Sequence, residues 1–438
     1  MDLGFAMIEI QVPIEKHERS WVALAFGWFF LLMAGYQILR PIRESLVSDL
    51  PSEEKPTLFL VVFFVMLVAV PVFGWVSSVV PRRWLAHVVF HFFVAQLVAF
   101  TAWIFLGTED HAVWQARIFF VWLSVFILFA TSVFWSVMAD LFSKAQGERL
   151  FGPIAAGATL GGIVGSSVAK WLAASLGLGW LLGIAAILLE LGLIAASMLR
   201  RLKNQSADDI ETDNQLADEP ELDKPEESGI WAGVIDVLNS PYLRSIAFYI
   251  ALVSFCGTMV YMQLTDSAKL AIPNRDERTA FFGSLNLYTQ LGTLVVQLLL
   301  IGPMMKRLGL GVVLSILPIV YAICFTLLGF SSSLFTLGLV DVLTRVGAYG
   351  VTVPAREVLF TVVEPDEKYK AKNVIDTVVL RGADAASSKL YIGIGQATSA
   401  AAFVPWLMLP VTAIWVVNAL SLGRGQKQQM EAERQRPE

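Results

Sequence analysis

The stretch W-V-A-L-A-F-G-W-F-F-L-L-M-A-G-Y-Q-I-L-R-P-I-R-E-S-L, residues 21–46, opens with fifteen residues of almost pure hydrocarbon and ends in a cluster of charges. An α-helix needs about 20 apolar residues to cross the ~30 Å core of a bilayer. The stretch therefore predicts a membrane helix. Each arginine near the middle of such a helix costs about 2.5–3.5 kcal/mol, so Arg40 and Arg43 indicate a function at membrane depth.

The composition of the whole chain agrees with a membrane protein. Its 438 residues are 56% hydrophobic and 16% charged, whereas about 25% of residues are charged in soluble domains. Both cysteines, Cys256 and Cys324, lie in apolar stretches and indicate no disulfide framework. The first twenty residues lack the basic segment and cleavage site of a secretory signal peptide.

Apolar runs of membrane-spanning length recur along the chain. The predicted spans are 21–46, 58–80, 84–106, 113–138, 150–176, 181–199, 242–264, 279–303, 311–330, 334–358, 373–396 and 403–422. The predicted fold class is therefore all-α, a polytopic membrane protein with twelve transmembrane helices.

The distribution of lysine and arginine between loops predicts the orientation, because short cytoplasmic loops carry an excess of both. They gather in the loops on one side and place both termini in the cytoplasm. The loop at 265–278 is an exception, because it carries Lys269, Arg275 and Arg278 on the opposite side.

An acidic segment divides the chain into two halves. Residues 204–229 contain ten acidic residues against one lysine, and such a segment buries too little apolar surface to order itself. Two sets of six helices joined in this way predict the major facilitator fold, with two bundles around a central cavity. The predicted organisation is an N-terminal segment 1–20, a bundle 21–203, a linker 204–229, a bundle 230–422 and a tail 423–438.

Polar residues form a cluster at the end of the first predicted helix. Arg40 and Glu44 are four residues apart and can neutralise each other on one helix face. Adjacent helical residues point about 100° apart, so we expect Arg43 to remain a surplus positive charge, and Tyr36 adds a hydroxyl to the cluster. Snorkelling to lipid headgroups is the alternative, but it does not explain so many polar residues together.

The second half carries polar stripes at helical spacing on its second, fourth and fifth predicted helices. Such stripes are costly against lipid, so we expect them to line protein or water. Hydrogen-bonded contacts between helices are the alternative for the second helix of this half. The candidate site residues here are Asn286 and Gln290, then Asp341 and Arg345, then Arg381 and Asp384.

Three further groups have candidate roles. Glu190 lies in the middle of a predicted helix without a basic neighbour one turn away, and we consider it for proton coupling. Arg82, Arg83, Lys306 and Arg307 occupy matching positions in the two halves and are candidate gate residues. The chain has no H-E-x-x-H or C-x-x-C motif, so we expect no catalytic site, metal or cofactor, and no enzyme activity.

Several blocks resemble the ATP:ADP antiporter family. I-L-R-P-I-R-E-S-L-V at 38–47 is similar to the family's first-helix signature I-L-R-x-x-K-[DE]-[TS]-L-V. The segments 133–152, 280–283, 354–360 and 368–376 resemble further family blocks in the same order. The resemblance covers residues 30 to 390 approximately and implies a nucleotide transporter of the major facilitator type.

The resemblance also assigns individual positions. Arg43 falls where the family has a substrate-binding lysine, and arginine can also bind phosphate oxygens. Two functional glutamates of the nucleotide exchangers are replaced here, one by the apolar region around Leu123 and the other near Tyr261 or Gln263.

We therefore expect a secondary active transporter of an anionic organic solute, with ATP/ADP-type exchange or uptake as the leading hypothesis. We expect a monomer in the bacterial inner membrane that binds no nucleic acid. A lipid or lipid-linked flippase, and a non-transporting sensor or assembly protein of the same fold, are the alternatives.

Overall fold

The protein is described by a computed structural model that covers residues 14–108, 111–211, 230–398 and 403–434. Most of the predicted N-terminal segment and of the acidic linker, and the end of the predicted tail, lie outside the described residues. The first residues of the linker, 204–211, continue a helix, so the expectation that the segment does not order is wrong for them. The described residues contain helices and no strand, so the predicted all-α class is confirmed.

The first half consists of six long helices. They are α1 (Arg19–Ser48), α2 (Lys55–Val79), α3 (Arg82–Leu106), α4 (Ala112–Leu141), α5 (Lys144–Leu176) and α6 (Leu178–Glu211), with the 3-10 turn η1 (Ser52–Glu54) before α2. Together they cover the predicted apolar runs apart from Val80, which follows α2, and each extends beyond its run at one end or both, because polar residues continue the helix outside the apolar core.

The second half is more broken. Its elements are α7 (Ile230–Asn239), α8 (Pro241–Ala271), α9 (Arg275–Val295), η3 (Val296–Leu300), α10 (Ile301–Leu308), α11 (Leu310–Phe330), α12 (Leu334–Gly347), η4 (Ala348–Thr352), α13 (Val353–Leu359), η5 (Phe360–Val362), α14 (Pro365–Val374), η6 (Ile375–Val379), α15 (Leu380–Thr398) and α16 (Val404–Arg434). The segments η3, η4 and η6 are π-helical turns inside longer helices. Such turns shift the side chains that follow them and often occur at functional sites.

Within the described residues, eleven helical segments are long and apolar enough to cross a membrane. The predicted span 373–396 is not among them, because Arg381, Asp384 and Lys389 lower its hydropathy. It nevertheless forms the helix η6–α15, which packs against α8 and α2. It completes the arrangement of twelve helices.

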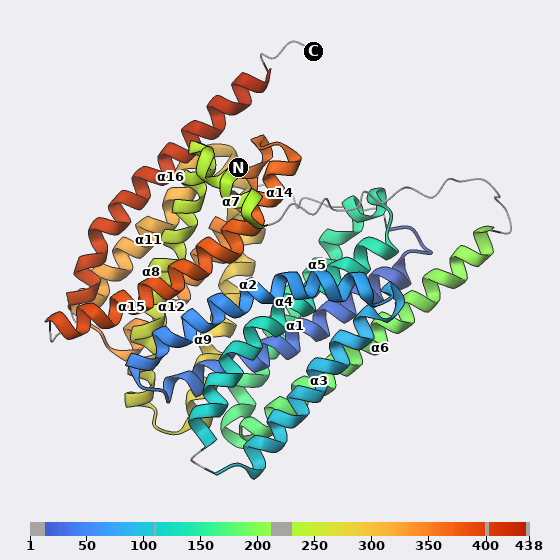
Figure 1. The fold of residues 1–438 in the computed structure, drawn as a ribbon, viewed down its shortest axis with the longest axis horizontal. Helices are drawn as coiled ribbons and strands as arrows, with labels where there is room; N and C mark the ends of the chain where they lie inside the picture. Colours follow the sequence, from blue (N-terminus) through green and yellow to red (C-terminus); the bar gives the residue numbers. More distant parts are fainter. Residues whose placement is uncertain (1–13, 109–110, 212–229, 399–402, 435–438) are drawn as a thin grey trace, which may run out of the picture.

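The buried apolar residues form two cores, one between Trp21 and Leu199 and the other between Val237 and Leu422. The two helix groups lean together around α1, α2 and α9 and diverge toward the ends of α6 and α14 (Figure 1). We call the side where α6 ends and α7 begins the linker face. The side where α1 ends and α8 turns into α9 is the far face.

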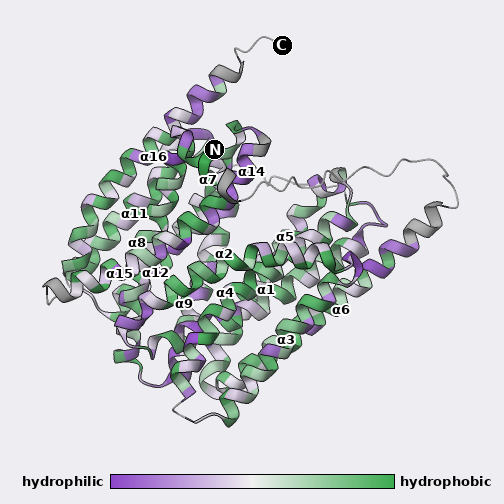
Figure 2. Ribbon diagram, viewed as in Figure 1, coloured by the Kyte–Doolittle hydropathy of each residue, from purple (hydrophilic) through white to green (hydrophobic). Residues whose placement is uncertain are grey.

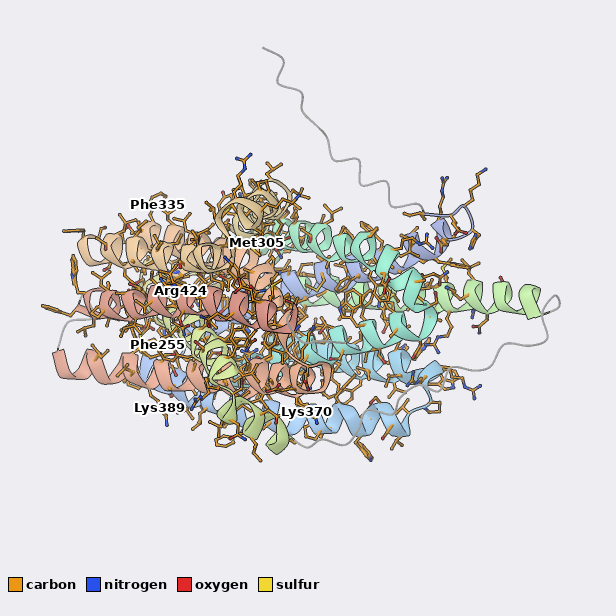
Figure 3. The ribbon with its side chains drawn as sticks, turned by 90° about the horizontal axis from the view of Figure 1, so that it is seen from above. Phe255, Met305, Phe335, Lys370, Lys389 and Arg424 are labelled. Atoms are coloured by element: carbon orange, nitrogen blue, oxygen red, sulfur yellow. The ribbon has the colours of Figure 1, made fainter. Side chains whose placement is uncertain are left out.

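The outer surface of the helices is apolar. Large hydrophobic side chains are exposed there, among them Trp75, Phe335 and Val417, and Phe335 projects outward (Figure 3). Hydrophilic residues concentrate at the helix ends and on some inner faces (Figure 2). Because an exposed apolar belt of this kind would be unstable in water, this surface faces lipid.

A tandem G-x-x-x-G motif brings α5 against α1. A Cβ atom added at Gly161 would lie 2.1 Å from the carbonyl oxygen of Phe30, and one added at Gly165 would lie 2.2 Å from that of Ala34. Only glycine permits this approach of two backbones, as in other membrane helix pairs. The packing fixes α1, which carries Arg40 and Arg43, against the first bundle.

We predict that Gly161→Ala destabilises the protein, because the added methyl group must separate α1 from α5. Overpacking of this kind costs about 1–3 kcal/mol, so the melting temperature of the purified protein should fall by several degrees. Gly152→Ala is the matched control, because nothing lies within 4 Å of a Cβ atom at that position of the same helix. An equal melting temperature for Gly161→Ala and wild type would contradict the account.

Candidate functional site

Two adjoining cavities have volumes of about 240 and 250 Å³; residues of the second half alone line the first, and residues of both halves line the second. They share Tyr321, Arg345 and Tyr349, and the first extends toward the linker face as far as Arg356. The charged side chains that line the second are Arg40, Arg43, Asp341, Arg345, Arg381 and Asp384. The structure therefore brings together arginines from α1, α12 and α15 that the sequence separates by up to 341 positions.

Glu44 holds the two arginines of α1. Its Oε1 atom lies 2.5 Å from Arg43 Nη2 and 3.8 Å from Arg40 Nε. The expected pair of Arg40 and Glu44 is therefore present, but the expectation that Arg43 has no acidic partner on its own helix is wrong. The long side chain of Arg43 bends back to its neighbour, which the angle between adjacent Cβ atoms does not reveal. Arg43 also lies over the ring of Phe120, with 5.2 Å from Cζ to the ring centroid.

The predicted pair on α12 is present. Arg345 Nη1 donates to Asp341 Oδ2 at 3.0 Å, and Nη2 donates to Asn286 Oδ1 on α9 at 2.6 Å. Asn286 is buried behind Arg345 and does not line either cavity. It orients the guanidinium group, which leaves one face of Arg345 toward the cavity.

The pair on α15 is looser. Arg381 Nη1 lies 3.4 Å from Asp384 Oδ2, which is beyond the usual range for a charge-assisted hydrogen bond. The other oxygen of Asp384 accepts hydrogen bonds from Ser254 and Thr258 of α8. Ser254 and Thr258 were not expected in the site, although with Tyr261 and Thr265 they form a polar stripe at helical spacing along α8 that could have indicated it.

Four predicted site residues line neither cavity: Glu44 and Asn286, which contact cavity arginines, and also Tyr36 and Gln290. Tyr36 packs against the first core and lines neither cavity. Gln290 points at α5, where its Nε2 atom is 2.5 Å from the position of a Cβ atom at Gly162. The polar stripe on α9 thus divides, with Asn286 facing Arg345 and Gln290 facing the other bundle.

Glu190 also lies away from both cavities. Its side chain is 37% exposed on the outer surface of α6, and Oε2 lies 3.7 Å from His91 Nε2 of α3. Its proposed coupling role stays a prediction.

The gate candidates lie at helix ends on the linker face. Arg82 pairs with Asp140 within the first half. Arg83, Lys306 and Arg307 are exposed. Their role in gating also stays a prediction.

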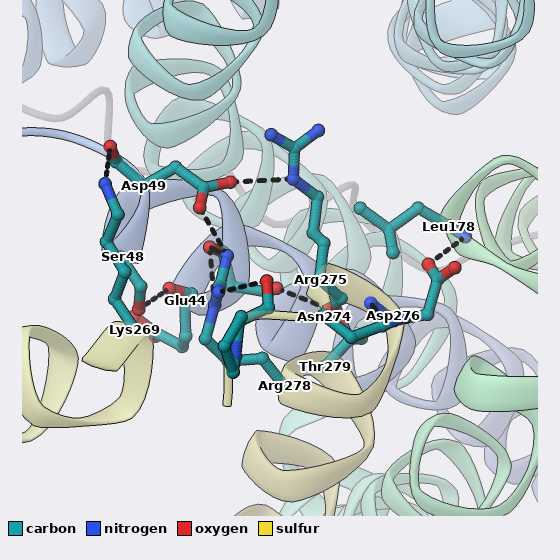
Figure 4. A network of polar contacts seen from close by, with 12 residues as sticks. Glu44, Ser48, Asp49, Leu178, Lys269, Asn274, Arg275, Asp276, Arg278 and Thr279 are labelled. Carbon is teal, nitrogen blue, oxygen red and sulfur yellow. Dashed lines mark hydrogen bonds and ion pairs between the residues drawn. The ribbon is translucent and has the colours of Figure 1, made fainter. Parts of the chain in front are cut away.

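A polar network at the far face joins the two halves (Figure 4). Asp49, just after α1, accepts from Arg278 Nη2 at 2.6 Å and from Arg275 Nε at 2.7 Å. Arg278 also donates to the carbonyl oxygens of Ser45 and Ile272 and is fully buried. Nearby, the fully buried Lys55 of α2 donates to Asp266 of α8 at 2.5 Å.

This network explains the exception in the loop charges. Lys269 donates to the carbonyl oxygen of Asp49 at 2.6 Å, so all three cations of the 265–278 segment contact Asp49. They hold the bundles together, and their charges are therefore not a guide to the orientation of the chain in the membrane. In the sequence, the only sign of this network was the unexpected cluster of cations at 265–278. That cluster did not indicate Asp49 as their partner.

The described ion pairs between the halves, Lys55–Asp266, Arg275–Asp49 and Arg278–Asp49, all lie at the far face. At the linker face, ion pairs such as Glu18–Arg149 stay within one half. Burial opposes the charge of Glu18, but hydrogen bonds from Arg149 and Gln146 hold the pKa of its carboxyl group below the usual value. The far face is thus the closed side of the cavity.

Comparison with known proteins shows which family this chain belongs to. A sequence model of the Major Facilitator Superfamily matches residues 24–356. The chain belongs to the Major Facilitator Superfamily. It is therefore a multi-pass membrane transporter, and its solute is a small molecule.

Relatives support a narrower placement. The chain is 22% identical to ADP,ATP carrier protein 1 of Chlamydia muridarum, with 94% of this chain and 89% of the relative covered. It is 21% identical to ADP,ATP carrier protein 1 of Chlamydia trachomatis, with 94% and 90% covered. The resemblance to the ATP:ADP antiporter family is thereby confirmed, and this chain is a divergent relative within the superfamily.

Solved structures confirm the fold. The nucleoside transporter NupG is similar with a TM-score of 0.60 at 12% identity, covering 95% of this chain and 99% of that one. A bacterial homologue of the human lysosomal transporter Spinster, in an inward-facing and unoccupied conformation, has a TM-score of 0.56 at 14% identity, with 95% and 94% covered.

We predict that Asp49→Asn opens the far face. The substitution leaves the buried guanidinium of Arg278 without its counter-charge, which typically costs 3–5 kcal/mol, and we expect opening of the far face to relieve this cost by exposing Arg278 to water. A cysteine introduced at Ser124 in the cavity, with both native cysteines replaced by serine, should react with an impermeant maleimide added at the far face. We expect Asp49→Asn to raise that rate at least about tenfold, which corresponds to about 1.4 kcal/mol.

Glu54→Gln is the matched control, because Glu54 pairs with Arg117 at the same face but within the first half. It should leave the labelling rate unchanged. Equal rates in Asp49→Asn and wild type would show that the network does not hold the far face closed.

Proposed function

We propose that the protein transports an anionic, phosphorylated organic solute, and that a nucleotide of the ATP/ADP type is the leading candidate. The proposal rests on one observation. Arg40 and Arg43 from the first half and Arg345 and Arg381 from the second line the same cavity. An anion bound there contacts both bundles at once. Its binding can therefore affect how the bundles move relative to each other.

The charge balance of the cavity favours an anion. Four arginines face three acidic side chains, Glu44, Asp341 and Asp384, each of which contacts at least one of them. The empty site therefore keeps its cations paired yet retains one net positive charge. Phosphate oxygens can replace the carboxylates, because guanidinium groups bind both through two parallel hydrogen bonds.

Aromatic side chains fit the remainder of a nucleotide. Phe120, Tyr261, Tyr321 and Tyr349 line the cavity beside the arginines. Rings of this kind stack on nucleobases in many binding sites, at about 1–3 kcal/mol for each base. The names of the relatives, ADP,ATP carrier proteins, support the same solute class.

The mechanism we propose is alternating access, in which two bundles rock around a site near the middle of the membrane. The lysines and arginines of the loops support a cytoplasmic linker face, in a bacterial inner membrane. The closed far face would then be periplasmic, and the conformation described here would be inward-facing. A cysteine introduced at Gln428 should accordingly be labelled from the cytoplasm, and one introduced at Ser332 should be labelled from the periplasm.

We also propose that the protein acts as a monomer and that residues 204–229 serve only as a connection between the bundles. One complete cavity within a single chain supports the first proposal. The acidic composition of the segment supports the second. A flippase would instead bind lipid headgroups, and a sensor would bind a solute without moving it.

We predict that ATP raises the melting temperature of the purified protein and that Arg43→Ala abolishes most of this effect. Truncating one partner of a desolvated charge pair weakens binding by about 2–5 kcal/mol, and here it also removes the net positive charge. Arg43→Lys should recover part of the binding, because it keeps the charge but loses the planar fork. The measurement is thermal shift against ATP concentration.

Arg117→Ala is the control, because Arg117 pairs with Glu54 away from the cavity. It should bind ATP as wild type does. If Arg43→Ala lowers the melting temperature of the empty protein but binds ATP normally, Arg43 is structural and the proposed anion site at this position is wrong. Stabilisation by lipid headgroups in place of ATP would favour the flippase.

A further inference from the structure

A compact cluster of oxygen atoms lies where α8 meets α15, at the edge of the cavity. Thr258 Oγ1 lies 2.8 Å from Asp384 Oδ1, and Ser254 Oγ lies 2.9 Å from the carbonyl oxygen of Leu380. Ser254 Oγ also contacts Asp384 Oδ1. Ser254 and Thr258 are buried, and the side chain of Asp384 is 14% exposed at the cavity wall.

The cluster has more oxygen–oxygen contacts than hydroxyl protons. Three contacts join these atoms, but Ser254 and Thr258 supply one proton each. One added proton on Asp384 Oδ1 completes the set, because it is donated to Ser254 Oγ while Ser254 donates to Leu380 and Thr258 donates to Asp384. Each of the three contacts then holds one proton.

Asp384 is also the cavity acid with the weakest hold on an arginine. Its contact with Arg381 is 3.4 Å, against 3.0 Å between Arg345 and Asp341 and 2.5 Å between Arg43 and Glu44. Arg381 remains partly exposed in the cavity. Neutralising Asp384 therefore breaks no strong ion pair, whereas neutralising Glu44 or Asp341 would.

We propose that Asp384, with Ser254, Thr258 and the Leu380 carbonyl, is a proton-binding site that couples solute binding to the proton gradient. A metal cation fits the cluster less well. Oxygens that share a cation at about 2.4 Å and lie at right angles around it are about 3.4 Å apart. The separations of 2.8 and 2.9 Å found here are those of hydrogen bonds.

Several other titratable or charged groups surround Asp384. Arg381 is on its own helix, and α8 contributes Ser254, Thr258 and, farther along the cavity, Tyr261. From α2, Phe59 and Val62 line the cavity and neither titrates. The remaining groups across the cavity are Arg40 and Arg43 of α1, Tyr321 of α11, Asp341 and Arg345 of α12, and Tyr349 of η4.

A proton on Asp384 changes what the cavity binds. It removes one negative charge and frees Arg381, so the four arginines then face two carboxylates. The anion binds more tightly to the protonated site, and by linkage the bound anion must raise the affinity for the proton by the same factor. Solute and proton would then cross the membrane together.

The first test needs no solute. Infrared difference spectra of the purified protein should show a protonated carboxyl band at about pH 7, where exposed carboxyl groups are ionised, and this band should be lost when the pH is raised further. Asp384→Asn should remove this band. Asp376→Asn is the matched control on the same helix, because Asp376 pairs with Arg356 at 2.6 Å and should contribute no such band.

Thr258→Val provides a second variant, since it removes a donor to the carboxylate and keeps the side chain's shape. The band should then persist to higher pH. A band that survives in Asp384→Asn would overturn the proposal, and so would a band that disappears when sodium chloride is added at constant pH. The latter result would make the cluster a sodium site.

The second test uses ATP as the probe and rests on the proposed function. Wild type should bind ATP at least tenfold more tightly at about pH 6 than at about pH 8, and Asp384→Asn should bind it tightly at both. An equal pH dependence in the two proteins would overturn the coupling. If ATP does not bind at any pH, the proposed solute is wrong, and the infrared result still decides whether Asp384 holds a proton.

Discussion

Pairing of buried charge is the constraint on which this structure depends. An arginine at membrane depth is stable only beside an acidic group or in water, and the protein meets this requirement in two places. Glu44, Asp341 and Asp384 hold the arginines of the cavity. Asp49 and Asp266 hold the cations of the far face.

The two sets differ in which elements they join. Each cavity pair connects residues of one helix, so it can persist while the bundles move. Each far-face pair connects the first half to the second, so it must break when that face opens. The cavity pairs therefore prepare a binding site, and the far-face pairs set the stability of the closed state. An anion that bridges the two sets of cavity arginines would add charge pairing between the bundles, which the described residues make only at the far face.

Sequence periodicity predicted the parts of this arrangement that lie on one helix. Asp341 and Arg345 are one turn apart, and the pair follows directly from that spacing. The twelve spans followed from the lengths of the apolar runs. The span at η6–α15 was the least apolar of them, because Arg381 and Asp384 lower its hydropathy. Periodicity failed for Gln290, because a stripe on α9 can face two neighbours and the sequence does not say where they lie. It failed for Arg43, because a long side chain can reach an adjacent residue. The contacts of Asp49 and Lys55 were out of reach, since their partners are more than 200 positions away.

We propose that one cavity, lined by arginines of both bundles, carries a phosphorylated anion across the membrane. Counterflow measures this most directly. The purified protein is placed in liposomes loaded with unlabelled ATP, and uptake of labelled ADP from outside is followed at equal pH on both sides. The account predicts that labelled ADP accumulates above its external concentration only in loaded liposomes that contain the protein. Uptake that is the same with empty liposomes, or absent in both while ATP still stabilises the protein, would contradict transport through this cavity.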